Sequence, residues 1–97
     1  MKPSKTEILH ILSQQKSILA QKYHVDKLGL FGSYAREEAT ENSDIDILVD
    51  FTKPIGMEIV DLTMELEKAL HYPIDIVTIN AVRQRLFDYI KQDLVYV

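Results

Sequence analysis

Hydrophobic residues recur at helical spacing in three parts of the chain. The first pattern begins after Ser4, which has the spacing of a capping box with Glu7, and continues to about Lys22. The second pattern is a single stripe of four side chains: Ile59, Leu62, Leu66 and Leu70. The third follows Asn80, a favourable N-cap, and consists of Val82, Leu86, Phe87 and Ile90. Three helices are therefore predicted, and residues 33–38 are expected to form a brief additional one.

Between these helices, hydrophobic residues follow the two-residue period of strands. Residues 44–51 alternate strictly, and four apolar side chains share one face: Ile45, Ile47, Val49 and Phe51. Residues 74–79 are rich in β-branched side chains, residues 28–31 are apolar but too short for a helix, and residues 94–97 are expected to add an extended tail. The link between the first two strands leaves room for only a small helix. The order of elements predicts an α/β (α+β) fold class, a small mixed sheet of about three strands flanked by helices.

Length and composition restrict the chain to a few classes of protein. With 97 residues it is expected to form a single domain, residues 1–97, with one core. The absence of cysteine excludes disulfides and thiol chemistry, and no apolar run approaches the ~20 residues of a membrane span or resembles a secretory signal. A net charge of −4 does not favour stable nucleic-acid binding. We therefore expect a cytoplasmic protein without membrane contact.

Three aspartates in the predicted strands are the first candidates for chemistry. Asp44 and Asp46 project to the same side of one strand, with Cα atoms roughly 6.6 Å apart, and Asp75 lies on the other clear strand. If these strands are neighbours in register, the three carboxylates converge into a cage that could hold two Mg²⁺ ions, or Mn²⁺, about 3.5–4 Å apart. Adjacent anions repel one another and need such a countercharge. The alternative is a solvated strand face, which antiparallel sheets commonly leave exposed.

A second candidate lies where the first strand is expected to end, at Gly32 and Ser33. The absence of a side chain at Gly32 lets backbone N–H groups approach an anion, and Ser33 adds a hydroxyl donor. Arg36, one helical turn later, can offer its guanidinium to a phosphate. The alternative is an ordinary strand-to-helix turn with Ser33 as the N-cap. The specific signal is the combination of this turn with the aspartates of the two strands that follow.

This combination resembles the DNA polymerase β-like nucleotidyltransferases. The matching motifs are Gly32-Ser-Tyr-Ala-Arg36 and Ser43-Asp-Ile-Asp-Ile-Leu-Val-Asp-Phe51, and Ile74-Asp-Ile-Val77 is similar to the strand that carries the third carboxylate of the family. The resemblance covers essentially the whole chain, in the order of elements as well as in the motifs. The chain looks most like the minimal nucleotidyltransferase (MNT) subgroup, which includes the antitoxin partners of HEPN toxins.

The resemblance implies a role for each candidate residue. Gly32 and Ser33 would hold the β- and γ-phosphates of ATP, with Arg36 as a further nucleotide-binding residue. Asp75 would complete one metal site and help to deprotonate the attacking hydroxyl. The catalytic residues that the resemblance implies are also the ligands of two Mg²⁺ ions: Asp44, Asp46 and Asp75.

The resemblance also implies a reaction and a partner. The chain would transfer AMP from ATP to a tyrosine of a HEPN-type ribonuclease toxin, as the antitoxin of a type VII-like toxin–antitoxin pair. One alternative is an MNT module with weak catalysis that neutralises its toxin by binding, and another is a small-molecule nucleotidyltransferase like those that modify aminoglycosides. Glu37 favours the first alternative, because relatives often carry glycine there and a positive φ would cost about 1–2 kcal/mol. The sequence is compatible with homo- and hetero-oligomers.

Overall fold

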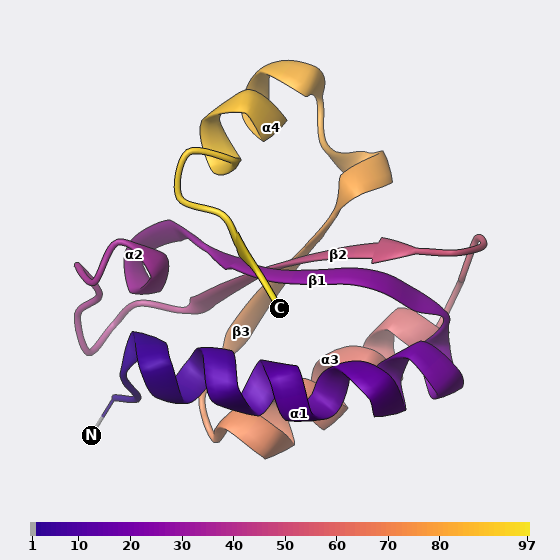
Figure 1. Cartoon of the computed structure of the whole chain (residues 1–97), viewed down its shortest axis with the longest axis horizontal. Coiled ribbons are helices and arrows are strands. Elements are labelled where there is room, and N and C mark those ends of the chain that lie inside the picture. Colours follow the sequence, from indigo (N-terminus) through magenta and orange to yellow (C-terminus); the bar gives the residue numbers. More distant parts are fainter. Residues whose placement is uncertain (1) are drawn as a thin grey trace.

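A computed structural model of the protein describes residues 2–97, whose elements are shown in Figure 1. In chain order they are α1 (Lys5–Tyr23), β1 (Val25–Phe31), α2 (Gly32–Ala35), β2 (Ile45–Phe51), α3 (Glu58–Leu70), β3 (Ile74–Thr78), the 3-10 helix η1 (Ile79–Ala81), α4 (Gln84–Ile90) and β4 (Val95–Tyr96). The predicted capping box is present at α1, where Ser4 and Glu7 each accept a hydrogen bond from the other's backbone N–H. No helix within residues 2–97 combines the length and the apolar character that a membrane crossing requires.

The strands of this part of the chain form one mixed sheet in the order β3-β2-β1-β4. β1 pairs antiparallel with both β2 and β4, whereas β2 and β3 are parallel. The predicted mixed sheet is therefore confirmed, with four strands in place of about three. The fourth strand is formed by the expected extended tail, which pairs with Gly29 and Leu30 of β1. A strand of two residues is too short for an alternation of its own, so only its pairing with β1 defines it.

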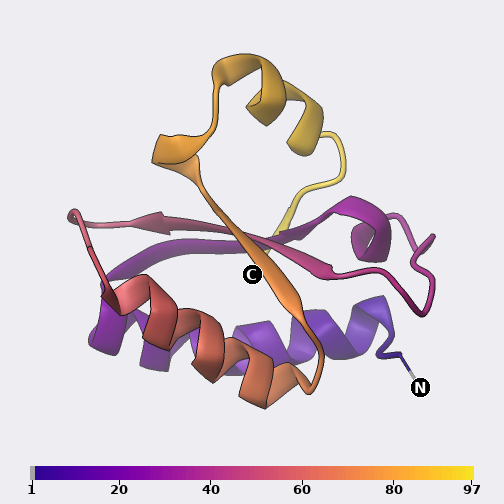
Figure 2. The same ribbon diagram turned by 180° about the vertical axis from the view of Figure 1, so that it is seen from behind.

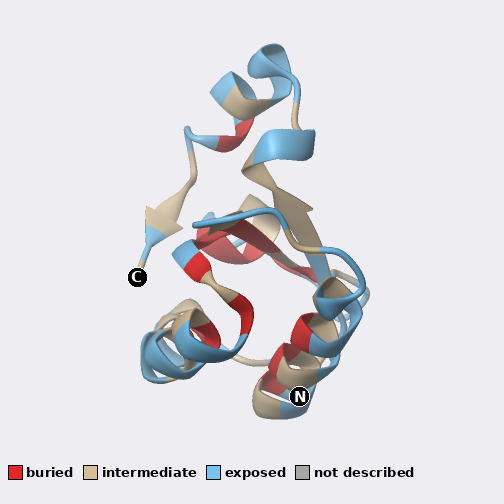
Figure 3. Cartoon of the chain, turned by 90° about the vertical axis from the view of Figure 1, so that its right-hand side faces the viewer, coloured by how far each residue is buried: buried red, intermediate tan, exposed pale blue. Residues whose placement is uncertain are grey.

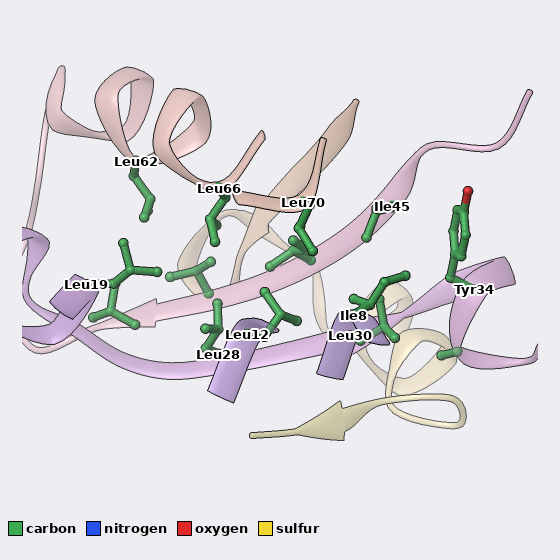
Figure 4. Packing of buried hydrophobic residues seen from close by; sticks show 14 of the residues in the cluster. Ile8, Leu12, Leu19, Leu28, Leu30, Tyr34, Ile45, Leu62, Leu66 and Leu70 are labelled. Carbon is green, nitrogen blue, oxygen red and sulfur yellow. The ribbon is translucent and has the colours of Figure 1, made fainter. Parts of the chain in front are cut away.

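The sheet has one closely covered face and one partly open face. α1 and α3 lie side by side on the first face, and α4 lies on the opposite one (Figure 1, Figure 2). Ile45, Ile47 and Val49 of β2 are fully buried in the core between the sheet and the two helices, and Leu62 and Leu66 point into this core from α3 (Figure 4). Figure 3 shows that α4, in contrast, is largely exposed. The alternate side chains of β2 are thus presented to the space beneath α4.

Two element boundaries differ from the prediction in ways that bear on the site. Asn80 does not start the last helix, because it lies in η1, and Val82 after it is extended (φ −96°, ψ 131°). The last α-helix, α4, begins only at Gln84. The strand predicted for residues 44–51 begins at Ile45, so Asp44 lies just before the strand and outside its hydrogen-bonded ladder.

Candidate active site

A cleft of about 400 Å³ lies at the open face of the sheet, where α4 contributes one wall. Its volume is within the range of about 300–1,000 Å³ that is usual for small-molecule sites. The lining residues are Phe31, Gly32, Ser33, Arg36, Asp46, Asp75, Val77, Leu86, Tyr89, Ile90 and Asp93. The fold therefore brings together five of the six predicted site residues, all except Asp44.

Gly32 joins β1 to α2 in a backbone conformation that favours glycine (φ +77°). A Cβ atom at this position would lie 3.0 Å from Cγ of Asp46 and closer still to its Oδ2. Glycine is thus required for two independent reasons, the positive φ and the lack of space. As a result, the backbone of the turn lies directly against the Asp46 carboxylate, and Ser33 follows it along the wall of the cleft.

Asp46 and Asp75 occupy paired positions on the parallel strands β2 and β3, and both line the cleft. The prediction that these two carboxylates share one side of the sheet is confirmed. Burial is the main reason why the pKa of Asp46 rises from 3.8 to about 6. The negative charges of Asp75 and Asp44 raise this pKa further, and Arg36 opposes them. The cleft therefore concentrates negative charge in a partly desolvated place.

Asp44 does not complete the predicted cage. It is exposed, precedes β2 and does not line the cleft. Within residues 2–97, no three His, Asp or Glu side chains are grouped closely enough to form a metal-binding cluster. The predicted three-carboxylate cage is therefore not formed in this arrangement of side chains. Carboxylates repel one another, and Asp44 is the one whose backbone the strand ladder does not hold.

The chemistry of the donors nevertheless fits a divalent cation. Asp46 and Asp75 present carboxylate oxygens, the hard ligands that suit Mg²⁺ and Mn²⁺. The pKa of Asp46 is raised mainly by burial and then by repulsion from Asp75 and Asp44, and a bound cation would offset this repulsion. Asp44 is near enough for its negative charge to contribute to this repulsion, although it does not line the cleft.

Arg36 also lines the cleft, but its guanidinium is held by two carboxylates. Nη1 donates to Asp93 at 2.7 Å and Nε donates to Glu38 at 2.8 Å. These hydrogen bonds, the one to Asp93 first, raise the pKa of Arg36. Asp93 lies 57 residues away, in the segment between α4 and β4. Arg36 therefore ties the turn at Gly32 to the C-terminal segment, in addition to the phosphate contact predicted for it.

Replacing Asp93 with asparagine should lower the free energy of unfolding, because it removes the charge of a partly shielded ion pair. The Asp93 side chain is only 20% exposed, so we expect a fall of about 4 °C in the melting temperature. The matched control is Asp88→Asn, which breaks the more exposed pair of Asp88 with Lys91 and should cost less than about 2 °C. Equal falls in melting temperature in the two variants, measured by calorimetry, would show that the pair of Arg36 with Asp93 stabilises the protein no more than the exposed pair does.

Glu37 adopts the left-handed conformation, with φ 60°. The cost of about 1–2 kcal/mol that a positive φ imposes on a residue with a side chain therefore applies. The side chain, however, lines a separate pocket with Lys2, Ser4 and Lys5 at the start of α1, and not the cleft of Asp46. The departure from the family pattern thus affects the backbone of the turn and leaves the cleft without an extra carboxylate.

Glu37→Gly should stabilise the protein, because glycine adopts a positive φ without steric cost. The gain is limited by the greater freedom of glycine in the unfolded chain, so we expect about 0.5 kcal/mol, or about 2–4 °C in the melting temperature. Glu37→Gln keeps the strain but removes the charge, and it should melt within about 1 °C of the parent. If glutamine stabilised the protein as much as glycine, charge and not backbone conformation would be the cause.

Six of the eleven residues that line the cleft were not predicted as site residues, among them Leu86, Tyr89 and Asp93. Leu86 was expected only as part of the apolar pattern of the last helix, yet it is 51% exposed, and Tyr89 is 63% exposed. Their spacing on one helix was visible in the sequence, but periodicity does not say where a helix will lie. Asp93 carries no recognisable signal, because its partner Arg36 is distant in the chain.

Known proteins resemble this chain in sequence. Residues 13–96 match the family described as polymerase beta, nucleotidyltransferase. The chain belongs to this family. A Methanocaldococcus jannaschii relative, named as a candidate protein adenylyltransferase, is 40% identical over 94 residues, which are 95% of this chain and 96% of that protein. The protein adenylyltransferase MntA of Thermococcus cleftensis is 37% identical over 92 residues, which are 94% of this nucleotidyltransferase and 93% of MntA.

Solved structures share the fold of this nucleotidyltransferase. A structure described as a minimal nucleotidyltransferase matches with a TM-score of 0.74 and 26% identity over 91% of this chain and 93% of that one. A structure described as a toxin–antitoxin with AMP-PNP matches with a TM-score of 0.70 and 22% identity, over 97% of this chain and 72% of that one. A third match is a chain from the complex of the tri-AMPylated Shewanella oneidensis HEPN toxin with MNT antitoxin. Its TM-score is 0.60 and its identity is 20%, over 95% of this chain and 66% of that one.

Proposed function

We propose that this nucleotidyltransferase transfers AMP from ATP to a tyrosine of a HEPN-type toxin and acts as the antitoxin. The observation that carries the proposal is the cleft, in which the paired carboxylates of Asp46 and Asp75 lie beside the turn at Gly32 and Ser33. A turn with a closely approachable backbone suits phosphate oxygens, and paired carboxylates suit a divalent cation. Nucleotidyl transfer needs both within reach of one phosphorus atom.

The residues of the cleft position the reactants in this proposal. The backbone of the turn at Gly32 and the Ser33 hydroxyl hold the β- and γ-phosphates. Asp46 and Asp75, with Asp44 as the proposed third carboxylate, would hold Mg²⁺, which would supply positive charge for the leaving pyrophosphate and lower the pKa of the acceptor hydroxyl. The acceptor oxygen forms a bond to the α-phosphorus, and the bond from this phosphorus to the bridging oxygen of the β-phosphate breaks. Asp75 accepts the proton of the acceptor hydroxyl, and pyrophosphate leaves.

The choice of nucleotide and partner is supported by the relatives. Two that align with nearly the whole chain are named as protein adenylyltransferases. Structures of the same fold include a toxin–antitoxin pair with AMP-PNP and an MNT antitoxin with its AMPylated HEPN toxin. By similarity we assign ATP as the donor and a HEPN-type toxin as the acceptor.

The test is transfer of label from ATP to a co-purified HEPN-type partner in the presence of Mg²⁺. Label at the α-phosphate should appear on a tyrosine of the toxin, and label at the γ-phosphate should not. Asp46→Asn should abolish transfer, whereas Asp50→Asn, on the same strand but outside the lining of the cleft, should retain it. The absence of toxin labelling by the parent protein would contradict the proposal.

The same experiment separates the two alternatives. Toxin inhibition that survives Asp46→Asn without any labelling would favour neutralisation by binding, and label on an aminoglycoside would favour a small-molecule enzyme. Glu37 adopts the positive φ on which the first alternative rests, but it lies outside the cleft, so it adds no negative charge there.

A further inference from the structure

α4 places two large apolar side chains in the cleft without burying them. Leu86 is 51% exposed and Tyr89 is 63% exposed, and both line the cleft beside the turn and the paired carboxylates. They are three residues apart, so they are neighbours on one face of the helix. Ile90, which is 4% exposed, is the only buried residue of α4. The core therefore does not account for Leu86 and Tyr89.

The position of this pair relative to the turn is held from both ends of the helix. Before α4, η1 continues directly from β3, the strand of Asp75. After α4, the side chain of Asp93 binds Arg36 beside the turn, and β4 then pairs with β1. The helix that carries Leu86 and Tyr89 is thus connected both to the strand of Asp75 and, through Arg36, to the turn at Gly32.

We propose that Leu86 and Tyr89 form the surface on which the nucleobase of the bound nucleotide stacks. This inference rests on the proposed function, in which the turn holds the phosphates and the paired aspartates lie near the α-phosphorus. The nucleoside of such a ligand must lie within the same cleft, and a flat aromatic ring beside an aliphatic chain offers it an apolar surface. Stacking on an aromatic side chain is favourable for every base, because every base has a π-face.

The same geometry predicts weak selectivity between nucleobases. α4 contributes Leu86, Tyr89 and Ile90 to the lining, and the Tyr89 hydroxyl is the only polar side-chain group among them. Stacking without hydrogen bonds to the base edge discriminates weakly between bases. ATP and GTP should therefore bind within about tenfold of each other.

The test compares a nucleotide with a ligand that has phosphates but no base. Binding of ATP and of inorganic tripolyphosphate to the full chain is measured by calorimetry with Mg²⁺ and without acceptor. Tyr89→Ala should weaken ATP binding about tenfold and leave tripolyphosphate binding unchanged, and Tyr89→Phe should bind ATP like the parent. Met64→Ala, at a side chain equally exposed (63%) on α3, is the matched control and should change neither affinity.

Each remaining outcome would overturn the inference in a distinct way. Equal loss of both ligands in Tyr89→Ala would mean that the ring supports the cleft and not the base. Unchanged ATP binding with weaker binding of the HEPN-type partner would assign the pair to acceptor docking. If the parent protein bound neither ATP nor tripolyphosphate, the proposed function itself would fail, and the stacking surface with it.

Discussion

Asp46→Asn is expected to abolish nucleotidyl transfer and, at the same time, to make the folded protein more stable. Activity should fall at least about 1,000-fold, because the variant loses several kcal/mol of charge stabilisation at the reacting phosphorus. Stability should rise because the half-buried carboxylate, next to the charges of Asp75 and Asp44, is unfavourable in its ionised form. After allowance for screening by solvent, we expect a gain of about 1 kcal/mol, or about 4–8 °C in the melting temperature.

The gain in stability should depend on pH in a defined direction. The pKa of Asp46 is raised from its ordinary 3.8 to about 6 in the folded protein, so the folded state binds this proton more tightly than the unfolded state. The parent protein should therefore gain stability at this site as the pH falls through 6 toward 4. The asparagine variant has no titrating group at this position and should show no such gain. Melting temperatures in chelator-containing buffer should differ most above pH 7 and converge near about pH 4.

Asp50→Asn is the matched control for this prediction. Asp50 is also half-buried on β2, but it does not line the cleft, and its Oδ1 accepts a hydrogen bond from the backbone N–H of Phe51. This variant should keep its activity and should not reproduce the pH-dependent gain. A variant Asp46→Asn that retained turnover, or that melted below the parent at pH 8, would contradict the role assigned to this carboxylate.

Gly32→Ala is expected to have the largest effect on stability. The positive φ of +77° costs a residue with a side chain about 1–2 kcal/mol, and crowding against the Asp46 carboxylate adds about 1–3 kcal/mol. We expect a total loss of about 3 kcal/mol, which corresponds to a fall of at least about 10 °C in the melting temperature. Urea denaturation should show the same loss as a lower midpoint with an unchanged slope.

Two further variants separate the causes of this loss. Gly56→Ala adds the same methyl group without crowding, because the nearest atom, Oε2 of Glu58, lies at an ordinary contact distance of 3.8 Å, and it should change stability by no more than about 0.5 kcal/mol. Gly32→Ala should cost less in an Asp46→Ala background than in the parent, because only the part that is due to φ remains there. If Gly32→Ala melted like the parent, the turn could not lie against Asp46 as described.

The sequence by itself determined the local parts of the site. Strict alternation in residues 44–51 assigned Asp46 to the face opposite Ile45 and Ile47, and the structure has the two isoleucines in the core and the aspartate in the cleft. The apolar segment ending at Gly32 likewise located the turn, where the positive φ requires glycine. These features could be predicted because the period of a strand and the sterics of glycine act within a few residues.

Only the tertiary structure decided which distant residues contact these local parts of the site. The pairing of Asp46 with Asp75 depends on which strands become neighbours, and the contact of Arg36 with Asp93 joins residues 57 positions apart. The same holds for Tyr89, whose helix pattern gave no indication that it would line the cleft. A hydrophobic period records which side of an element is apolar, but not which other element will lie against its polar side. That choice follows from how the whole chain crosses the sheet, with α4 carried from one edge strand, β3, to the other, β4.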